Sequence, residues 1–349
     1  MTAAVSTRDK RPRHWMKYVK WEWVKRWKAR VRQERRHEET AYPYSFGSKD
    51  RAFLGFTGDV LWLVSLPDYD GYRQAPSLIA RLDITAAGEY GSSAEFLDVA
   101  PEVRGSGHNI VLGRHDGESY FPINNMFHTL LELEFEGRAP RLADAYERRD
   151  TSRDATRGPY FSLAQHFRKH RLLTPDSVDK IEDFAAAVRE GRRAFISYRR
   201  SDFPQRRGGA LVFPEQLGIE LTAQRIACWW DQWNLPGGHD ESSWLRPNLL
   251  EDLLEDAVRQ AAWMVALMGP GYLASDDDSW TRWEWQGAVA LRTASGRRHE
   301  MRRLAVFFSK ADRQAHRARW IKRGDRTLVA AEDEPGMVAA AIARVISSS

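Results

Sequence analysis

The sequence predicts an α/β protein with two unlike parts, and three observations carry this prediction. The chain has 349 residues, more than one hydrophobic core usually fills. From Arg193 onward, short apolar runs alternate with segments of helical periodicity, which predicts a parallel sheet with helical crossovers. Residues 50–136 instead contain apolar runs separated by turn residues, which predict a β-rich α+β part ahead of that sheet.

The composition is that of a globular protein, with 42% hydrophobic and 29% charged residues. No apolar run approaches the roughly 20 residues of a membrane span, and no apolar secretory segment opens the sequence. Cys228 is the only cysteine, which excludes an internal disulfide and a cysteine zinc site. We therefore expect a cytoplasmic protein without a transmembrane segment.

Residues 1–40 form a basic, aromatic arm. The net charge is +5, but lysines and arginines crowd between Arg8 and Arg36, so the rest of the chain is net acidic. Apolar residues recur at helical spacing, which predicts an amphipathic helix from about His14; they are Met16, Val19, Trp23 and Trp27. Three interpretations stay open: a helix docked on its own domain, a nucleic-acid arm, or a membrane-surface helix.

Residues 41–173 form the β-rich part. Strands are expected at 60–64, 77–84, 109–113 and 130–135, with turns at 70–71 and 87–88. A small barrel or curled sheet fits this spacing, and residues 119–125 are candidates for the lining of a polar pocket. The spacing resembles that of the PUA-like and EVE-like barrels, which implies a sensor or recruitment domain for a nucleic acid or nucleotide. The alternative is a structural or ligand-sensing β-domain of other specificity.

A connecting helix is expected at 174–191. Thr174 suits its N-cap, Pro175 its first turn and Gly191 the position just past its end. The domain boundary is therefore placed near Gly191, and residues 192–349 form the C-terminal domain.

The C-terminal domain alternates strands and helices. Strands are expected at 194–198, 225–230, 263–268, 304–308 and 327–330, and helices at 211–224, 244–260, 280–291 and 337–346. Parallel sheets of this type bind ligands outside the carboxyl ends of their strands. The residues that follow each strand are therefore the candidates for function.

Four motifs follow in order along this domain: Phe-Ile-Ser-Tyr-Arg-Arg at 195–200, Asp231 with the Leu-Pro-Gly-Gly loop at 235–238, Pro-Gly-Tyr at 270–272, and Trp-x-x-x-Glu at 280–284. Together they resemble a TIR domain, and more narrowly the NAD-cleaving TIR domains of bacterial anti-phage defence proteins. The resemblance covers 192–349. It implies a flavodoxin-like parallel sheet, NAD+ as substrate, and activation by homo-oligomeric assembly through the TIR domains.

Glu284 occupies the position of the family's catalytic glutamate. On a helix, Trp280 and Glu284 lie at i and i+4, so they share one face. Nicotinamide departs from a ribosyl cation, which a carboxylate stabilises without a metal or a second acid. The alternative is a solvated glutamate paired with Arg282 or Arg292.

The expected NAD+-binding residues lie at the same edge of the sheet. They are Ser197, Tyr198, Arg199, Arg200, Asp231, Trp233 and Trp280. Arginine forks match phosphate oxygens, an aspartate can orient a ribose, and tryptophans can stack on a base. The alternatives are core packing for the aromatic residues and a surface ion pair with Asp202 for the arginines.

The sequence thus predicts an NAD+ nucleosidase that yields nicotinamide and ADP-ribose or its cyclic form. A non-catalytic TIR scaffold and a nucleic-acid sensor with a regulatory TIR domain remain the alternatives. His166 and His170 lie at i and i+4, a spacing that can bind zinc, but no nearby carboxylate completes a metal site.

Overall fold

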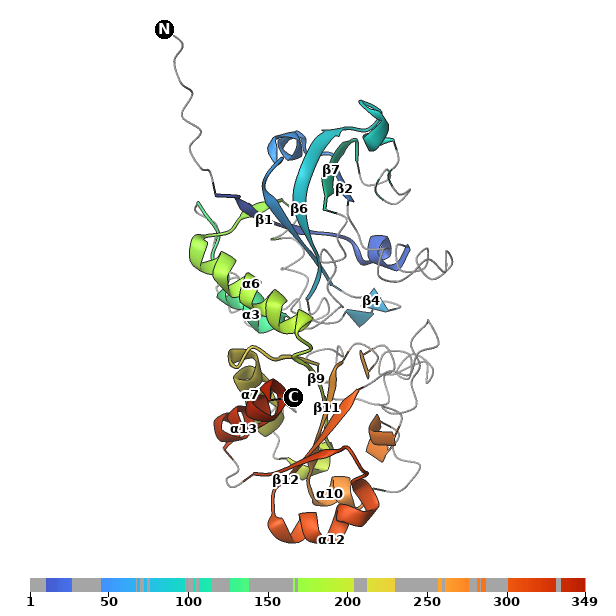
Figure 1. The fold of residues 1–349 in the computed structure, drawn as a ribbon, viewed down its shortest axis with the longest axis vertical. Helices are drawn as coiled ribbons and strands as arrows, with labels where there is room; N and C mark the ends of the chain where they lie inside the picture. The colour runs from blue at the N-terminus through green and yellow to red at the C-terminus, as the bar shows by residue number, and fades with distance from the viewer. Residues whose placement is uncertain are drawn as a thin grey trace, which may run out of the picture.

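The structure is a computed structural model of the 349-residue chain. The ranges that it describes are 11–26, 45–66, 76–97, 107–114, 126–137, 169–203, 212–229, 261–275, 301–330 and 334–348, together with the shorter stretches 68–69, 72–73, 257–258, 281–282 and 284–286 and positions 99, 103 and 166. Within them the protein is α/β, with a mixed sheet and a parallel sheet that is flanked by helices (Figure 1).

The mixed sheet has six strands in the order β2-β7-β6-β3-β1-β8. Their bounds are β1 His14–Tyr18, β2 Ser45–Ser48, β3 Val60–Ser65, β6 Ser77–Glu89, β7 Asn109–Gly113 and β8 Arg171–Leu172. Neighbours pair antiparallel except β1 and β3, which run parallel. A separate hairpin joins β4 (Asp68–Tyr69) to β5 (Tyr72–Arg73), and short 3-10 turns span Arg51–Gly55 and Ala94–Phe96. The strands expected at 60–64, 77–84 and 109–113 are confirmed.

The helix expected from His14 does not begin there, because residues 14–18 form β1; within the described part of this arm, which ends at residue 26, residues 21–26 are helical. Met16, Val19 and Trp23 are all buried, at 0%, 4% and 7% exposure. Their spacing therefore reflects burial of residues in a strand and in the helix that follows it, not one face of a single helix. Arg13 pairs with Asp59 at 2.8 Å, which ties the start of this strand to the sheet. This stretch of the basic segment is therefore part of its own domain.

Two further expectations in this region are wrong. The strand expected at 130–135 is wrong in its first half, where residues 130–132 end helix α3 (Phe127–Glu132), and Phe135 forms only an isolated bridge with Leu173; Leu130 in the helix and Leu133 at its C-cap are both buried. The turn expected at 87–88 is interior to β6, which pairs with β7 as far as Glu89. Residues 119–125 lie outside the described residues.

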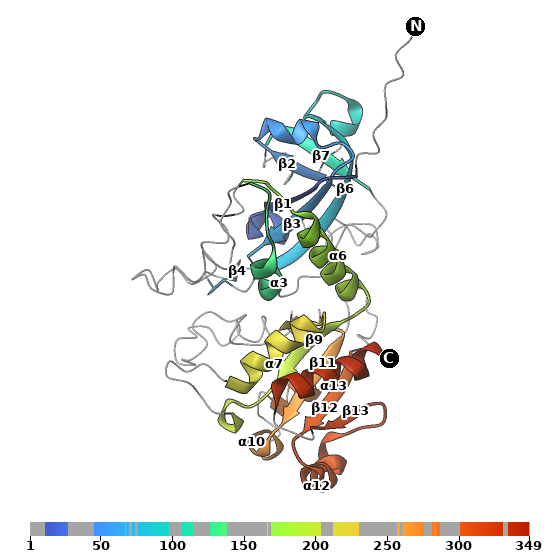
Figure 2. The same cartoon turned by 90° about the vertical axis from the view of Figure 1, so that its left-hand side faces the viewer.

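Helix α6 (Pro175–Arg189) lies against one face of the mixed sheet and leads into the parallel sheet (Figure 2). Thr174 is its N-cap residue and Pro175 its first residue, as expected. Gly191 has a φ of 79°, the left-handed conformation that suits a glycine just past a helix. Glu182 of α6 binds Arg81 of β6 at 3.2 Å.

The parallel sheet has five strands in the order β10-β9-β11-β12-β13, all parallel. Their bounds are β9 Arg193–Ser197, β10 Ala227–Trp229, β11 Trp263–Met268, β12 Arg302–Phe307 and β13 Arg326–Val329. Helices with described bounds in this part are α7 Val212–Ala223, α10 Pro270–Leu273, α12 Lys310–Trp320 and α13 Pro335–Ser347, and a 3-10 turn spans Arg200–Asp202. Numbered within this sheet along the chain, the strand order is 2-1-3-4-5.

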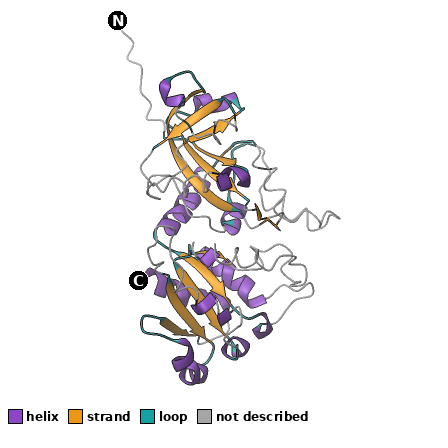
Figure 3. Ribbon diagram, turned by 90° about the vertical axis from the view of Figure 1, so that its right-hand side faces the viewer, coloured by secondary structure: helices purple, strands orange, loops and turns teal. Residues whose placement is uncertain are grey.

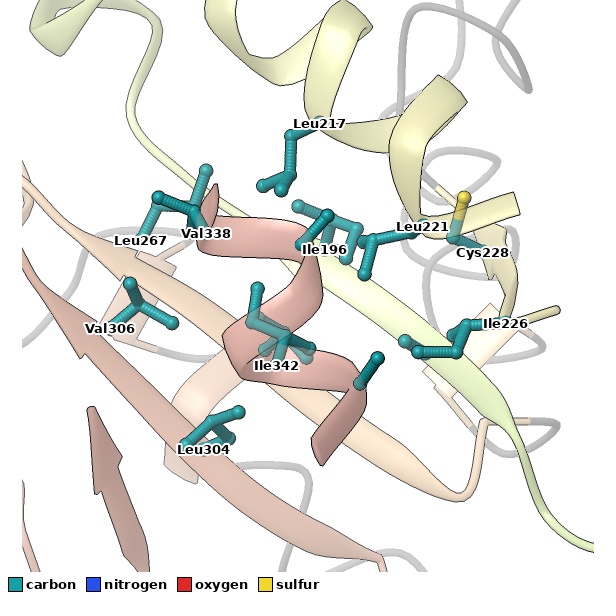
Figure 4. Close-up of a cluster of buried hydrophobic side chains, with 14 of the residues drawn as sticks. Ile196, Leu217, Leu221, Ile226, Cys228, Leu267, Leu304, Val306, Val338 and Ile342 are labelled. Carbon is teal, nitrogen blue, oxygen red and sulfur yellow. The ribbon is translucent and has the colours of Figure 1, made fainter. Parts of the chain in front are cut away.

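Helices cover both faces of this sheet (Figure 3). Helices α7 and α13 pack together on one face, where their apolar side chains meet the strands (Figure 4). The residues that Figure 4 labels are Ile196, Leu217, Leu221, Ile226, Cys228, Leu267, Leu304, Val306, Val338 and Ile342. On the other face, α10, Trp285 and Trp320 of α12 close a second cluster.

All five strands of the expected C-terminal pattern are present, within a few residues of the expected bounds. Helix α12 was not expected from the sequence. Most of the helix expected at 244–260 lies outside the described residues, although 257–258 are helical. Across the described parts of the chain, no helix combines the length and apolar character that crossing a bilayer requires.

Candidate functional site

The carboxyl ends of β9 and β11 mark the point where the order of the parallel sheet reverses. β9 has β10, its successor in the chain, on one side and β11 on the other. Chain connections from neighbouring strands leave such a point in opposite directions, and this arrangement is where open α/β sheets bind ligands. The residues that follow these two strands are therefore the candidate site.

Ser197 and Glu284 meet at this edge. Ser197 is the last residue of β9 and is 1% exposed. Its hydroxyl donates to Glu284 Oε2 at 2.5 Å. Glu284 is half-buried in the helical stretch 284–286. The structure therefore places the expected catalytic carboxylate at the carboxyl end of the first strand of the sheet, bound to a residue 87 positions away.

Tyr272 adds a second hydroxyl to this pair. Its Oη lies 3.0 Å from Ser197 Oγ and 3.2 Å from the carbonyl oxygen of Thr281, so its one proton has two acceptors within reach. The Tyr272 side chain is fully buried. Burial, followed by the negative charge of Glu284, raises the pKa of Tyr272 above its usual range, so the phenol keeps its proton.

Asp202 holds the turn that carries Tyr272. Its Oδ1 accepts from the backbone N–H of Gly271 at 2.6 Å, and its Oδ2 accepts from that of Tyr272 at 2.9 Å. A Cβ atom at Gly271 would lie 2.5 Å from Asp202 Oδ1, and one at Gly269 would lie 2.6 Å from Oδ2. The two glycines are therefore required for this close approach. Both carboxylate oxygens of Asp202 thus accept from backbone N–H groups of this turn.

Arg199 braces the same turn. Its Nη1 donates to the carbonyl of Gly271 at 2.9 Å and to Ser275 Oγ at 3.0 Å. Arg319 of α12 donates to the Ser275 carbonyl at 2.8 Å. Of the two expected phosphate-binding arginines, the structure thus brings Arg199 to the α10 turn, while Arg200 begins the following 3-10 turn.

Tyr198 points to the opposite face of the sheet from Ser197, as alternation along a strand requires. It is 9% exposed and packs in the cluster formed with α7 and α13, where the centroid of its ring lies 6.1 Å from that of the Phe203 ring. The structure does not bring this tyrosine to Glu284, and core packing describes its position.

The residue after Glu284 anchors the helical stretch. Trp285 is 1% exposed, and its Nε1 donates to the carbonyl of Trp320 at 2.8 Å. Arg303 donates to the Trp285 carbonyl at 3.1 Å and lies over its ring at 4.9 Å. Asp325 in turn binds Arg303 at 2.6 Å, and both side chains are almost fully buried. Contacts from α12 and β12 thus fix Trp285, the residue beside the carboxylate.

Asp231, Trp233 and Trp280, the remaining expected NAD+-binding residues, lie outside the described residues. Sequence reasoning missed the roles of Tyr272 and Asp202. The Pro-Gly-Tyr motif marked the turn at 270–272, but no spacing rule connects a tyrosine there with a glutamate twelve residues later. The partners became visible only with the fold.

A cavity of about 380 Å³ lies at the amino ends of β9, β11 and β12, opposite the edge that carries Glu284. Arg192, Trp263 and Arg302 are among its lining residues. It is therefore separate from the candidate site. In the described part of the chain, no group of three or more histidine, cysteine, aspartate or glutamate side chains is arranged to hold a metal ion.

Comparison with known proteins gave no match to a family model, to a curated protein or to a solved structure.

Proposed function

We propose that the C-terminal part of this chain is a TIR-type domain that breaks the bond between nicotinamide and ribose in NAD+. The observation that carries the proposal is Glu284 Oε2 bound to Ser197 Oγ at 2.5 Å, at the carboxyl end of β9. The parallel order 2-1-3-4-5 supports it, because a flavodoxin-like sheet has this order. The choice of NAD+ rests on the resemblance of the four motifs.

The chemistry needs one carboxylate. The C1–N bond of the ribosyl pyridinium breaks, and its electron pair leaves with neutral nicotinamide. The Glu284 carboxylate stabilises the positive charge that develops on the ribosyl carbon and ring oxygen. Water then forms the new C–O bond and loses a proton to solvent, which gives ADP-ribose; attack by a nucleophile of the same molecule gives a cyclic product.

Arg199 and Arg200 remain the candidates for contact with the pyrophosphate. Arg199 is exposed, and Nη1 is the nitrogen that it commits to the α10 turn. A guanidinium carries five N–H donors, so donors remain on Nε and Nη2 for an anion. In this proposal, Asp231, Trp233 and Trp280 complete the site.

The mixed sheet is proposed as the sensor or recruitment part, with a nucleic acid or nucleotide as its ligand. Assembly of TIR domains into a homo-oligomer would then switch on NAD+ cleavage in a cytoplasmic defence response. This part of the proposal depends on the resemblance alone, and a turnover assay with and without candidate nucleic acids addresses it.

The direct test is release of nicotinamide from NAD+ by the full chain, measured by chromatography over a range of protein concentrations. Glu284→Gln keeps the shape of the side chain and removes its charge, so we expect a loss of about 100-fold or more in kcat. Glu220→Gln on α7 is the matched control and should keep wild-type turnover. Absence of turnover in the wild type at high concentration, with and without a crowding agent, would favour the non-catalytic scaffold.

A further inference from the structure

Four groups from three segments form one hydrogen-bonded chain at the candidate site. Glu284 Oε2 lies 2.5 Å from Ser197 Oγ, Ser197 Oγ lies 3.0 Å from Tyr272 Oη, and Tyr272 Oη lies 3.2 Å from the Thr281 carbonyl oxygen. Thr281 is three residues before Glu284 in the sequence, so the hydrogen-bonded series begins and ends in the same short segment. We infer that Ser197 and Tyr272 are positioning residues that orient the Glu284 carboxylate for the reaction proposed above.

The direction of the hydrogen bonds follows from counting protons. An ionised carboxylate only accepts, so the single proton of Ser197 goes to Glu284. Ser197 Oγ can then only accept from Tyr272, whose one proton also has the Thr281 carbonyl within reach. Donation from Tyr272 polarises the serine hydroxyl and strengthens its own donation to the carboxylate. Tyr272 therefore acts on Glu284 through Ser197.

Burial strengthens the hydrogen bonds by which Ser197 and Tyr272 orient Glu284. Ser197 is 1% exposed and Tyr272 is fully buried, so solvent water does not compete for either hydroxyl. Both residues are held in place by the backbone. Ser197 ends a strand that pairs with β11, and the backbone N–H of Tyr272 donates to Asp202 Oδ2. Glu284, by contrast, has a terminal torsion with a broad energy minimum, so its carboxylate plane needs an external constraint.

Orientation matters because a carboxylate stabilises an oxocarbenium ion only from a defined position. A displacement of about 1 Å in a catalytic group costs on the order of 100-fold in rate. The Ser197 hydroxyl was expected from the sequence to contact NAD+. Its hydrogen bond to Glu284 instead assigns it to the protein side of the site.

The first test is a kinetic double-mutant cycle on the full chain. We expect Ser197→Ala to lower kcat about 100-fold with a change in KM of less than about threefold. Tyr272→Phe should lower kcat about fivefold, the value of one neutral hydrogen bond. Because Tyr272 acts through Ser197, the double variant should equal Ser197→Ala alone. Additive losses, or losses in KM only, would overturn the inference.

A matched control separates positioning from general damage. Ser65 in β3 is also 1% exposed, and its hydroxyl donates to the Val19 carbonyl at 2.9 Å, far along the chain from the site. Ser65→Ala removes a comparable buried hydrogen bond and should leave kcat unchanged. An equal loss of kcat in this variant would show that the Ser197 effect is not specific to the carboxylate.

A second readout is independent of turnover. Difference infrared spectroscopy between wild type and Glu284→Gln isolates the carboxylate band of Glu284. That band should move in Ser197→Ala, move less in Tyr272→Phe and stay in place in Ser65→Ala. An unmoved band in Ser197→Ala would refute the orienting role whatever the activity. A moved band in a protein without NAD+ turnover would instead refute the proposed function and leave the orienting role standing.

Discussion

The buried ion pair between Arg303 and Asp325 allows a prediction whose magnitude follows from the structure. The pair is 2.6 Å long, and its side chains are 6% and 5% exposed, so solvent screening does not reduce the interaction. Asp325→Asn removes one charge and leaves the Arg303 guanidinium buried without its counterion. We expect a loss of about 3–5 kcal/mol in the free energy of unfolding of the parallel sheet.

Urea denaturation followed by circular dichroism measures this loss, with hydrogen exchange of the β12 amides assigning the transition. Glu89→Gln is the matched control, because its ion pair with Arg51 is exposed and should contribute about 0–1 kcal/mol. The double variant Arg303→Met/Asp325→Asn removes the stranded charge and should recover much of the lost stability. A cost below about 1 kcal/mol for Asp325→Asn would refute the reasoning from burial.

Two further predictions concern titratable groups. Burial is the main cause that lowers the pKa of His14 and His170 below 6.5, so the unfolded chain binds more protons just below that pH. The stability of the mixed sheet should therefore fall as pH drops through 6.5, and urea midpoints at pH 5.5, 6.5 and 7.5 measure this; the raised pKa of Glu182 acts in the opposite direction nearer pH 4.5. Burial raises the pKa of the Cys228 thiol from 9.0 to about 12. At pH 8 the native thiol should react with a disulfide reagent about 1,000-fold more slowly than the unfolded one, and equal rates would contradict its burial.

The parallel sheet was predictable because its central strands contain apolar runs that are bounded by polar or turn residues. Residues 263–268, for example, are all buried, which leaves a strong local signal. Helix α12 was not expected because most of its residues are polar or charged and Trp320 is its one buried residue, so it has no apolar periodicity. Its N-cap was readable, however: Ser309 Oγ accepts from the N–H of Asp312 at 3.0 Å, the Ser-x-x-Asp pattern of a helix start.

In the mixed sheet, pairing between distant residues overrode local pattern. Five residue pairs join β1 to β3, which lies more than forty residues later in the sequence. The residues around His14 alone therefore do not predict a strand. The candidate site also combines residues that local motifs predicted with one that only the fold identified. Glu284 and Ser197 were found from motifs, whereas the part played by Tyr272 depends on where two strands end in space.

The position of β1 in the sheet determines what N-terminal truncation does to this protein. β1 lies between β3 and β8, so removing the first 20 residues would open a gap inside the sheet. The bared edge of β3, six apolar or small residues long, would then offer unsatisfied amide and carbonyl groups to other chains. A shortened protein would therefore tend to self-associate, and charge-reversal substitutions are the sounder way to ask what the basic segment binds.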